Sequence, residues 1–140
     1  MNPIVSPALE THWLTKRFRH HPALDSLELA VYPGDVFALL GSNGSGKSTT
    51  FRLLLNIYHP NSGESSLLGV PSSKLNGSAF EKIGYISEGQ KMPGWMSVAR
   101  FLEYCSGFYP EWEAELCRIL WSASAFLRDR KSNTFRGVNA

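Results

Sequence analysis

The sequence lacks long apolar runs, an excess of charge of one sign and paired cysteines. No apolar run comes close to the length of about 18 residues that a transmembrane helix needs. Residues 1–13 have neither the basic start nor the long apolar centre of a secretory signal. The net charge of +2 is too small to indicate a nucleic-acid partner. Cys105 and Cys117 form no pattern of a disulfide framework or a zinc site. We therefore expect a soluble, cytoplasmic chain without a transmembrane segment or a nucleic-acid partner.

The composition and the order of the predicted elements indicate one ordinary globular domain in which strands precede a helix. The chain has 140 residues, of which 43% are hydrophobic and 19% charged, so it can bury a core. Leu9–Leu14 and Leu27–Val31 alternate in the manner of strands, and Tyr32–Asp35 has the composition of a turn. Val36–Leu40 is continuously apolar, which predicts a buried central strand. Lys47–Ile57 carries apolar residues at helical spacing.

The second half of the chain predicts one more strand and two helices. Lys82–Ser87 has the pattern of a strand. Glu111 and Glu113, after Pro110, fall in the predicted first turn of the last helix, where the positive end of the helix dipole favours them. We therefore do not take these two carboxylates as catalytic. The other helix carries an apolar stripe that we expect to face the core: Val98, Phe101, Leu102, Cys105 and Phe108.

A glycine-rich loop lies between the apolar run and the first helix. Gly41, Gly46, Lys47 and Ser48 satisfy the pattern G-x-x-x-x-G-K-[ST] of a phosphate-binding loop. Glycines let successive N–H groups point inward as an anion nest, to which the following helix adds the positive end of its dipole. The lysine supplies a mobile charge for the β- and γ-phosphates, and the serine hydroxyl is a hard ligand suited to Mg²⁺. The predicted nucleotide-binding residues of the loop are Gly41, Ser42, Asn43, Gly44, Ser45, Gly46, Lys47, Ser48 and Thr49.

The alternative interpretation of this loop is a glycine-rich turn that binds nothing. With average glycine usage, the four fixed positions match by chance in roughly one chain in a few hundred of this length. The expected strand before the loop and helix after it lower that chance further. The sequence therefore predicts the binding of a nucleoside triphosphate with Mg²⁺.

Three stretches around the loop indicate a family. They are LTKRFRHHPALDSLELAVYPGDVFALLGSNGSGKSTT, NSGE and IGYISE. Together they strongly resemble the ATP-binding subunit of ABC transporters, over about Leu9 to Leu120. The resemblance implies an α/β fold, with a P-loop core of mostly parallel strands and helices preceded by a short antiparallel β portion. It assigns residues 1–120 to the N-terminal part of an ATP-binding domain and leaves residues 121–140 as an aperiodic tail.

The resemblance also implies roles for two residues outside the loop. In the family an aromatic residue at the position of Phe18 stacks on adenine, and such stacking contributes about 1–3 kcal/mol per base. The alternative for Phe18 is a plain core residue. Glu88 stands where most members carry a glutamine that contacts Mg²⁺ and the attacking water, and its surroundings resemble a branch of exporters with glutamate there. Candidate catalytic residues are therefore Lys47 and Glu88, and candidate metal ligands are Ser48 and Glu88; the alternative for Glu88 is an ordinary surface acid.

Several motifs of the family do not occur in these 140 residues. The sequence has no Leu-Ser-Gly-Gly-Gln signature, no apolar strand ending in Asp-Glu after the loop and no switch histidine. We therefore expect a truncated or frameshifted domain that binds ATP and does not hydrolyse it by itself. The implied partners are membrane-spanning permease subunits and a second ATPase subunit, identical or different. The implied location is the inner face of the cell membrane, where the assembled transporter powers export.

Two other interpretations stay open on the sequence alone. A small P-loop GTPase would carry Asn-Lys-x-Asp, which is absent, and a small P-loop kinase would need an acceptor site and a basic lid, neither of which we identify. A gene remnant without a working activity would share the same ancestry. It would differ from the first interpretation only in whether the chain folds and binds ATP.

Overall fold

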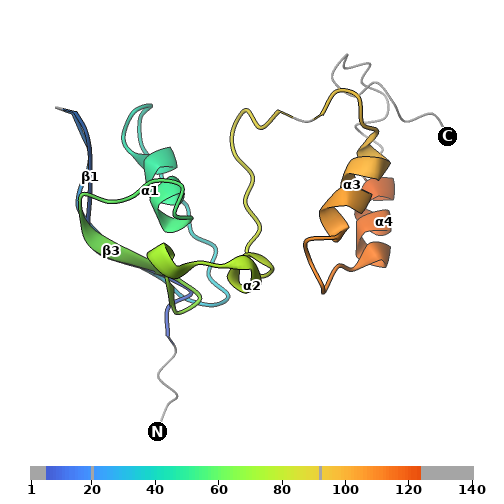
Figure 1. Cartoon of the computed structure of the whole chain (residues 1–140), viewed down its shortest axis with the longest axis horizontal. Helices are drawn as coiled ribbons and strands as arrows, with labels where there is room; N and C mark the ends of the chain where they lie inside the picture. The colour runs from blue at the N-terminus through green and yellow to red at the C-terminus, as the bar shows by residue number, and fades with distance from the viewer. Residues whose placement is uncertain (1–5, 20, 92, 124–140) are drawn as a thin grey trace, which may run out of the picture. The chain divides into compact units, whose positions relative to one another are not determined.

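The computed structural model describes residues 6–19, 21–91 and 93–123. The chain divides into two compact units, the first ending at Phe80 and the second beginning at Glu81. Among the described residues, the strands and the glycine-rich loop belong to the first unit, and the second unit holds two longer helices (Figure 1).

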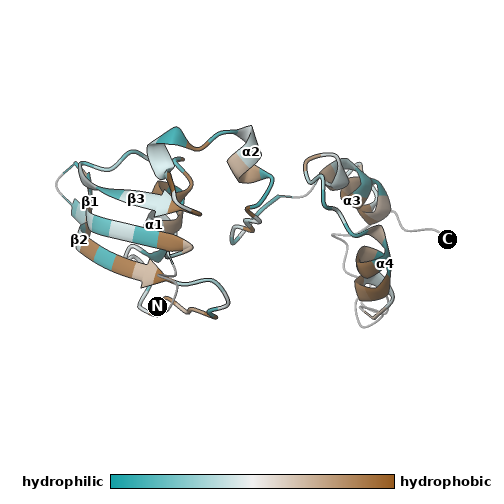
Figure 2. Ribbon diagram, turned by 90° about the horizontal axis from the view of Figure 1, so that it is seen from below, coloured by the Kyte–Doolittle hydropathy of each residue, from teal (hydrophilic) through white to brown (hydrophobic). Residues whose placement is uncertain are grey.

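The first unit is built on an antiparallel sheet with the strand order β2-β1-β3-β4. The strands are β1 (Leu9–Phe18), β2 (His21–Val31), β3 (Ser62–Leu67) and β4 (Val70–Pro71). Figure 2 shows the first three side by side, with apolar and polar residues alternating along β2. The two strands that alternation predicts before the loop are confirmed and are longer than expected. The predicted antiparallel N-terminal portion is therefore present.

A bulge in β1 decides which of its side chains enter the core. Strict alternation would place Thr11, Trp13 and Thr15 on one face. Trp13 instead adopts a left-handed backbone with φ 50° and is 68% exposed, while Leu14 is fully buried together with Thr11. The β3 backbone passes close to this bulge, since a β carbon on Gly63 would lie 2.2 Å from the Trp13 carbonyl oxygen.

Helix α1 (Lys47–Leu54) supplies most of the remaining core of the first unit. Its buried side chains are Thr50, Leu53 and Leu54, and the helix contacts β2 and β3. It ends three residues before the predicted end at Ile57. Asn56 adopts a left-handed conformation with φ 57°, and the N–H of Ile57 donates back to the Arg52 carbonyl over 2.8 Å, which closes the last turn.

Short elements complete the first unit. The 3-10 turn η1 (Ser72–Lys74) and helix α2 (Gly77–Phe80) follow β4. The buried Ser72 hydroxyl lies 2.8 Å from that of Ser65 in β3, which ties η1 to the sheet. Ala79 of α2 is also buried.

The second unit contains α3 (Val98–Ser106) and α4 (Ala114–Ala123). The Ser97 side chain caps α3 by accepting from the Arg100 N–H. The predicted helix is confirmed, but its apolar stripe is not a buried core, because no side chain of α3 or α4 is buried and Phe108 is 56% exposed. Two short helices do not cover that stripe within the described residues.

The start of α4 also differs from the prediction. The helix begins at Ala114, so Glu111 and Glu113 precede it, and Glu115 is the acidic residue of its first turn. Glu115 pairs with Arg118, one turn later, through two bonds of 3.0 and 2.6 Å. The Arg118 guanidinium lowers the pKa of the Glu115 carboxyl below its usual value. Residues 124–140, which include most of the predicted tail, lie outside the described residues.

Two predicted strands are wrong. Val36–Leu40 and Lys82–Ser87 form no strand, and Val36, Leu40 and Ile86 are almost fully exposed. A central parallel strand needs hydrogen-bonded neighbours on both edges, and in residues 6–19, 21–91 and 93–123 the only sheet is the antiparallel one of the first unit. The α/β class is confirmed, whereas the parallel strands of the expected P-loop core are not formed by these segments.

Candidate nucleotide-binding site

The glycine-rich loop is anchored at its end by a close approach to β2. Gly46, the residue before α1, has φ 91° and is buried. A β carbon at this position would lie 2.3 Å from the Ala23 carbonyl oxygen and 2.8 Å from Leu24 Cδ2. Only glycine fits both this backbone conformation and this contact. The second glycine of the required pattern therefore sets the point at which the loop joins the sheet.

Lys47 folds back over the loop that precedes it. Its Nζ atom donates to the carbonyl oxygens of Gly41 and Ser42, over 2.7 and 2.8 Å, and lies 3.4 Å from Ser45 Oγ. The positive charge is thereby held at the centre of the loop, beside the start of α1. This is the position at which the sequence predicts a charge for the phosphates.

The start of α1 leaves a group of backbone donors available. The first helical N–H that is bonded belongs to Thr50, which donates to the Gly46 carbonyl over 2.8 Å. Within the described part of the chain, no hydrogen bond uses the N–H groups of residues 46–49. Such donors, together with the positive end of the helix dipole, suit an anion. The loop therefore fits a phosphate, and the exposed hydroxyl of Ser48 fits a hard cation such as Mg²⁺.

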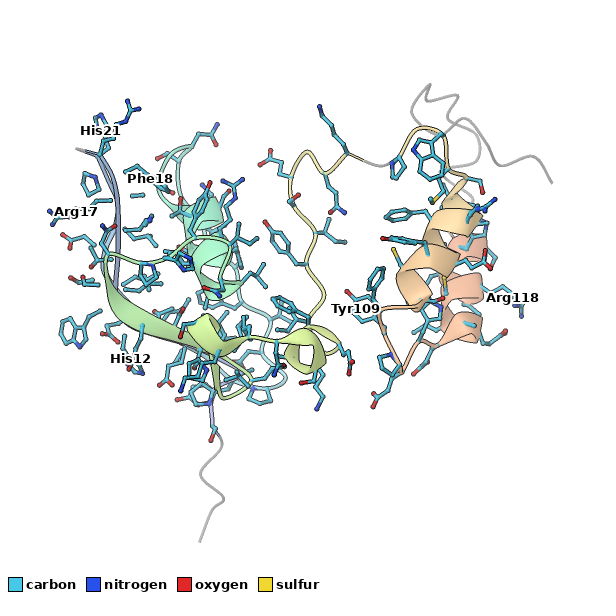
Figure 3. All side chains as sticks on the ribbon, viewed as in Figure 1. His12, Arg17, Phe18, His21, Tyr109 and Arg118 are labelled. Atoms are coloured by element: carbon cyan, nitrogen blue, oxygen red, sulfur yellow. The ribbon has the colours of Figure 1, made fainter. Side chains whose placement is uncertain are left out.

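Phe18 ends β1 as a partly exposed side chain rather than a core residue. It is 42% exposed, and its ring meets the Tyr58 ring edge to face, with centroids 5.4 Å apart. Figure 3 shows Phe18 on the side of β1 that faces α1. The alternative of a plain core position is thus wrong, while the stacking of Phe18 on a base stays a prediction.

Phe18 and the loop belong to the same end of the β1–β2 pair. Gly46 packs against Ala23 and Leu24 of β2. Leu24 in turn is the register partner of Lys16, which precedes Phe18 by two residues. The sequence places Phe18 and the loop more than twenty residues apart, and the sheet register brings them to one region of the first unit.

Glu88 is the one predicted site residue that belongs to the second unit. It is exposed, in a turn that the Gln90 N–H closes by donating to the Ser87 carbonyl over 3.2 Å. Phe18 and the loop residues belong to the first unit, so the contribution of Glu88 to catalysis or metal binding stays a prediction.

Sequence reasoning missed the neighbours of Phe18. Lys16 Nζ lies 5.1 Å from the centre of the Phe18 ring, and Arg52 lies beside Tyr58. The sequence could have placed Lys16 beside Phe18, because residues two apart on a strand share a face. No sequence pattern predicts the contact of Tyr58 with Phe18, since forty residues separate them and only the tertiary fold brings them together.

Comparison with known proteins identifies the family. The sequence profile of the family described as ABC transporter matches residues 24–135, which is more than half of the chain. The chain belongs to the ABC transporter family. This confirms the resemblance to ATP-binding subunits and overturns the alternative of a small P-loop kinase or GTPase.

Individual relatives agree with the assignment. The probable multidrug ABC transporter ATP-binding protein YbhF of Escherichia coli is 37% identical over 101 residues, which is 72% of this chain and 18% of that protein. The ribose import ATP-binding protein RbsA 1 of Agrobacterium fabrum is 47% identical over 64 residues, or 46% of this chain and 12% of that protein. The mouse ATP-binding cassette sub-family A member 7 is 32% identical over 133 residues, or 90% of this chain and 6% of that protein.

A solved structure supports the same family at the level of the fold. The ATP-binding subunit of an ABC transporter superposes with a TM-score of 0.69 and 26% identity, covering 79% of this chain and 46% of that one. The chain thus spans less than half of that structure and under a fifth of the length of the three curated relatives named above. In residues 6–19, 21–91 and 93–123, no helix combines the length and apolar character needed to cross a membrane.

Proposed function

We propose that the chain binds ATP with Mg²⁺ as the ATP-binding part of an ABC transporter. The N–H groups of residues 46–49 and the Lys47 ammonium bind the phosphates, and Phe18 stacks on the adenine. The Ser48 hydroxyl is a ligand of Mg²⁺, which when bound neutralises charge on the phosphates. Glu88 stays a candidate ligand on the family resemblance alone.

The observation that carries this proposal is the position of Lys47. Its ammonium is held over the loop by two carbonyl oxygens, next to four backbone donors at the start of α1. A cation and unbonded N–H groups thus occur together in the loop and the first turn of the helix that follows it. A glycine-rich turn that binds nothing would not need this arrangement.

The transporter role rests on the family. We propose that the chain works with membrane-spanning permease subunits and a second ATPase subunit, at the cytoplasmic face of the cell membrane. Export is the proposed direction, because the residues around Glu88 resemble a branch of exporters. The transported substrate is selected by the permease.

We further propose that these 140 residues bind ATP without hydrolysing it. Phosphoryl transfer needs a group that positions the attacking water and further charge at the γ-phosphate. The family supplies these through the Asp-Glu strand, the signature and the switch histidine, none of which occurs in the sequence. Lys47 and Ser48 hold the reactant, and the remaining machinery has to come from elsewhere.

The test is a calorimetric titration of the purified chain with Mg-ATP. A hydrogen bond to a charged group is worth about 1.5–3 kcal/mol, so Lys47→Ala should weaken ATP by roughly tenfold to a hundredfold. Lys74→Ala is the matched control, because Lys74 is an exposed lysine of the same unit outside the loop. A folded chain without saturable ATP binding, or equal affinity in the parent and Lys47→Ala, would contradict the proposal.

A further inference from the structure

Two aromatic and two cationic side chains form a cluster around Phe18. Its ring meets that of Tyr58 edge to face, with an interplanar angle of 76°. Lys16 Nζ lies 5.1 Å from the Phe18 ring centre and 6.0 Å from that of Tyr58. The Arg52 guanidinium lies 5.5 Å from the Tyr58 ring centre and its Nη1 is 3.3 Å from the Tyr58 hydroxyl. Tyr58 is therefore the member that joins Phe18 to α1.

The backbone fixes Tyr58 relative to α1. Its N–H donates to the Arg52 carbonyl over 3.0 Å, immediately after the left-handed turn at Asn56. The Tyr58 ring and main chain are thus both attached to Arg52. Since Arg52 lies in α1, the Tyr58 ring has a defined position relative to the helix whose first residue is Lys47.

The residues after Tyr58 are bound to β1. Lys16 Nζ donates to the His59 carbonyl over 2.6 Å, and the Asn61 N–H donates to the Thr15 carbonyl over 2.9 Å. The Asn61 side chain accepts from the Arg17 N–H over 2.8 Å. The segment that carries Tyr58 is therefore held by α1 on one side and by the end of β1 on the other.

We propose that Tyr58 is a positioning residue of the base site. It holds the Phe18 ring in the orientation in which the ring stacks with the base. The inference rests on the proposed function and adds a residue to it. Phe18 is 42% exposed, and an exposed ring without a neighbour would have to be ordered when the base binds. The edge-to-face contact and the Lys16 ammonium order it beforehand.

The cluster also helps to set the distance between the base site and the phosphate loop. Lys47 begins α1 and Arg52 lies in its last turn, so one helix carries the phosphate charge at one end and the support of Tyr58 at the other. The separation between the base platform and the phosphate loop is then set by α1 and the Arg52–Tyr58–Phe18 contacts. A nucleoside triphosphate uses both ends of this arrangement, whereas inorganic triphosphate uses only the loop.

The experiment compares the affinities of Mg-ATP and inorganic triphosphate for the full chain and three variants. An aromatic pair of this kind corresponds to roughly a twofold to tenfold change in affinity. Tyr58→Ala should weaken ATP by that factor and leave triphosphate unchanged. Tyr58→Phe keeps the ring and should retain the parental ATP affinity. Tyr104→Ala is the matched control, because Tyr104 makes an edge-to-face contact with Phe108 in the second unit, at 5.1 Å and 75°, and should change neither affinity.

The outcomes separate this inference from the proposed function. Equal losses of ATP and triphosphate in Tyr58→Ala would mean that Tyr58 only supports the fold, and unchanged ATP binding would remove its role altogether. If the parent chain shows Lys47-dependent ATP binding, either result overturns this inference and leaves the proposed function standing. A parent that binds neither ligand overturns the proposed function and the inference with it. If Tyr58→Ala does not fold, Tyr58→Leu replaces it, since leucine fills part of the space without a ring.

Discussion

The contact between the loop and β2 predicts that two glycines of the same loop respond differently to alanine. Gly44 and Gly46 have similar backbone angles, φ 85° and 91°. A side chain costs about 1–2 kcal/mol in this left-handed region at either position. At Gly44 a β carbon meets nothing within 4 Å, whereas at Gly46 it would lie 2.3 Å from the Ala23 carbonyl oxygen. Such overlap adds about 1–3 kcal/mol at Gly46 alone.

Hydrogen exchange of the β1–β2 amides, followed by NMR, measures this difference in the first unit. When closing is fast, a loss of about 1–3 kcal/mol speeds exchange by about fivefold to a hundredfold. Gly46→Ala should therefore exchange faster than Gly44→Ala by that factor, because the two variants share the cost of the left-handed backbone. Equal exchange rates in the two variants would refute the reasoning, since they would show that the loop does not approach Ala23 in solution.

Two further predictions concern the base and the chemical step. Phe18→Ala should lower ATP affinity by roughly fivefold or more while leaving inorganic triphosphate nearly unchanged, and Phe18→Trp should retain most binding. Equal losses for the two ligands would assign Phe18 to the fold instead. The purified chain with Mg-ATP should release no phosphate above the level of its Lys47→Ala control; sustained turnover that depends on Lys47 would reveal catalytic groups that the sequence does not display.

Local patterns predicted the parts of the fold that neighbouring residues determine. The alternation before the turn predicted β1 and β2, and the loop pattern predicted the start of α1 at Lys47, because dihedral preferences and the loop's glycines act over a few residues. The end of α1 was misjudged since Asn56 carries a left-handed turn that the apolar spacing does not reveal.

Parts that depend on distant partners could not be predicted. Ser62–Leu67 is polar and lacks β-branched residues, yet it becomes β3 by pairing with β1. Val36–Leu40 shows the converse, because an apolar run becomes a strand only where neighbours pair with it. The same dependence hid Tyr58, which reaches Phe18 only after α1 and the sheet have formed.

The bulge in β1 has an optical consequence. Trp13 is the only tryptophan before residue 95, and its left-handed backbone turns the indole away from the core, leaving it 68% exposed. An indole already in water changes its emission little when the surrounding chain unfolds. Trp95 is 81% exposed and should respond as weakly. Intrinsic fluorescence should therefore follow mainly the half-buried Trp112 and Trp121 of the second unit, and unfolding of the first unit would pass almost unseen in a fluorescence melting curve.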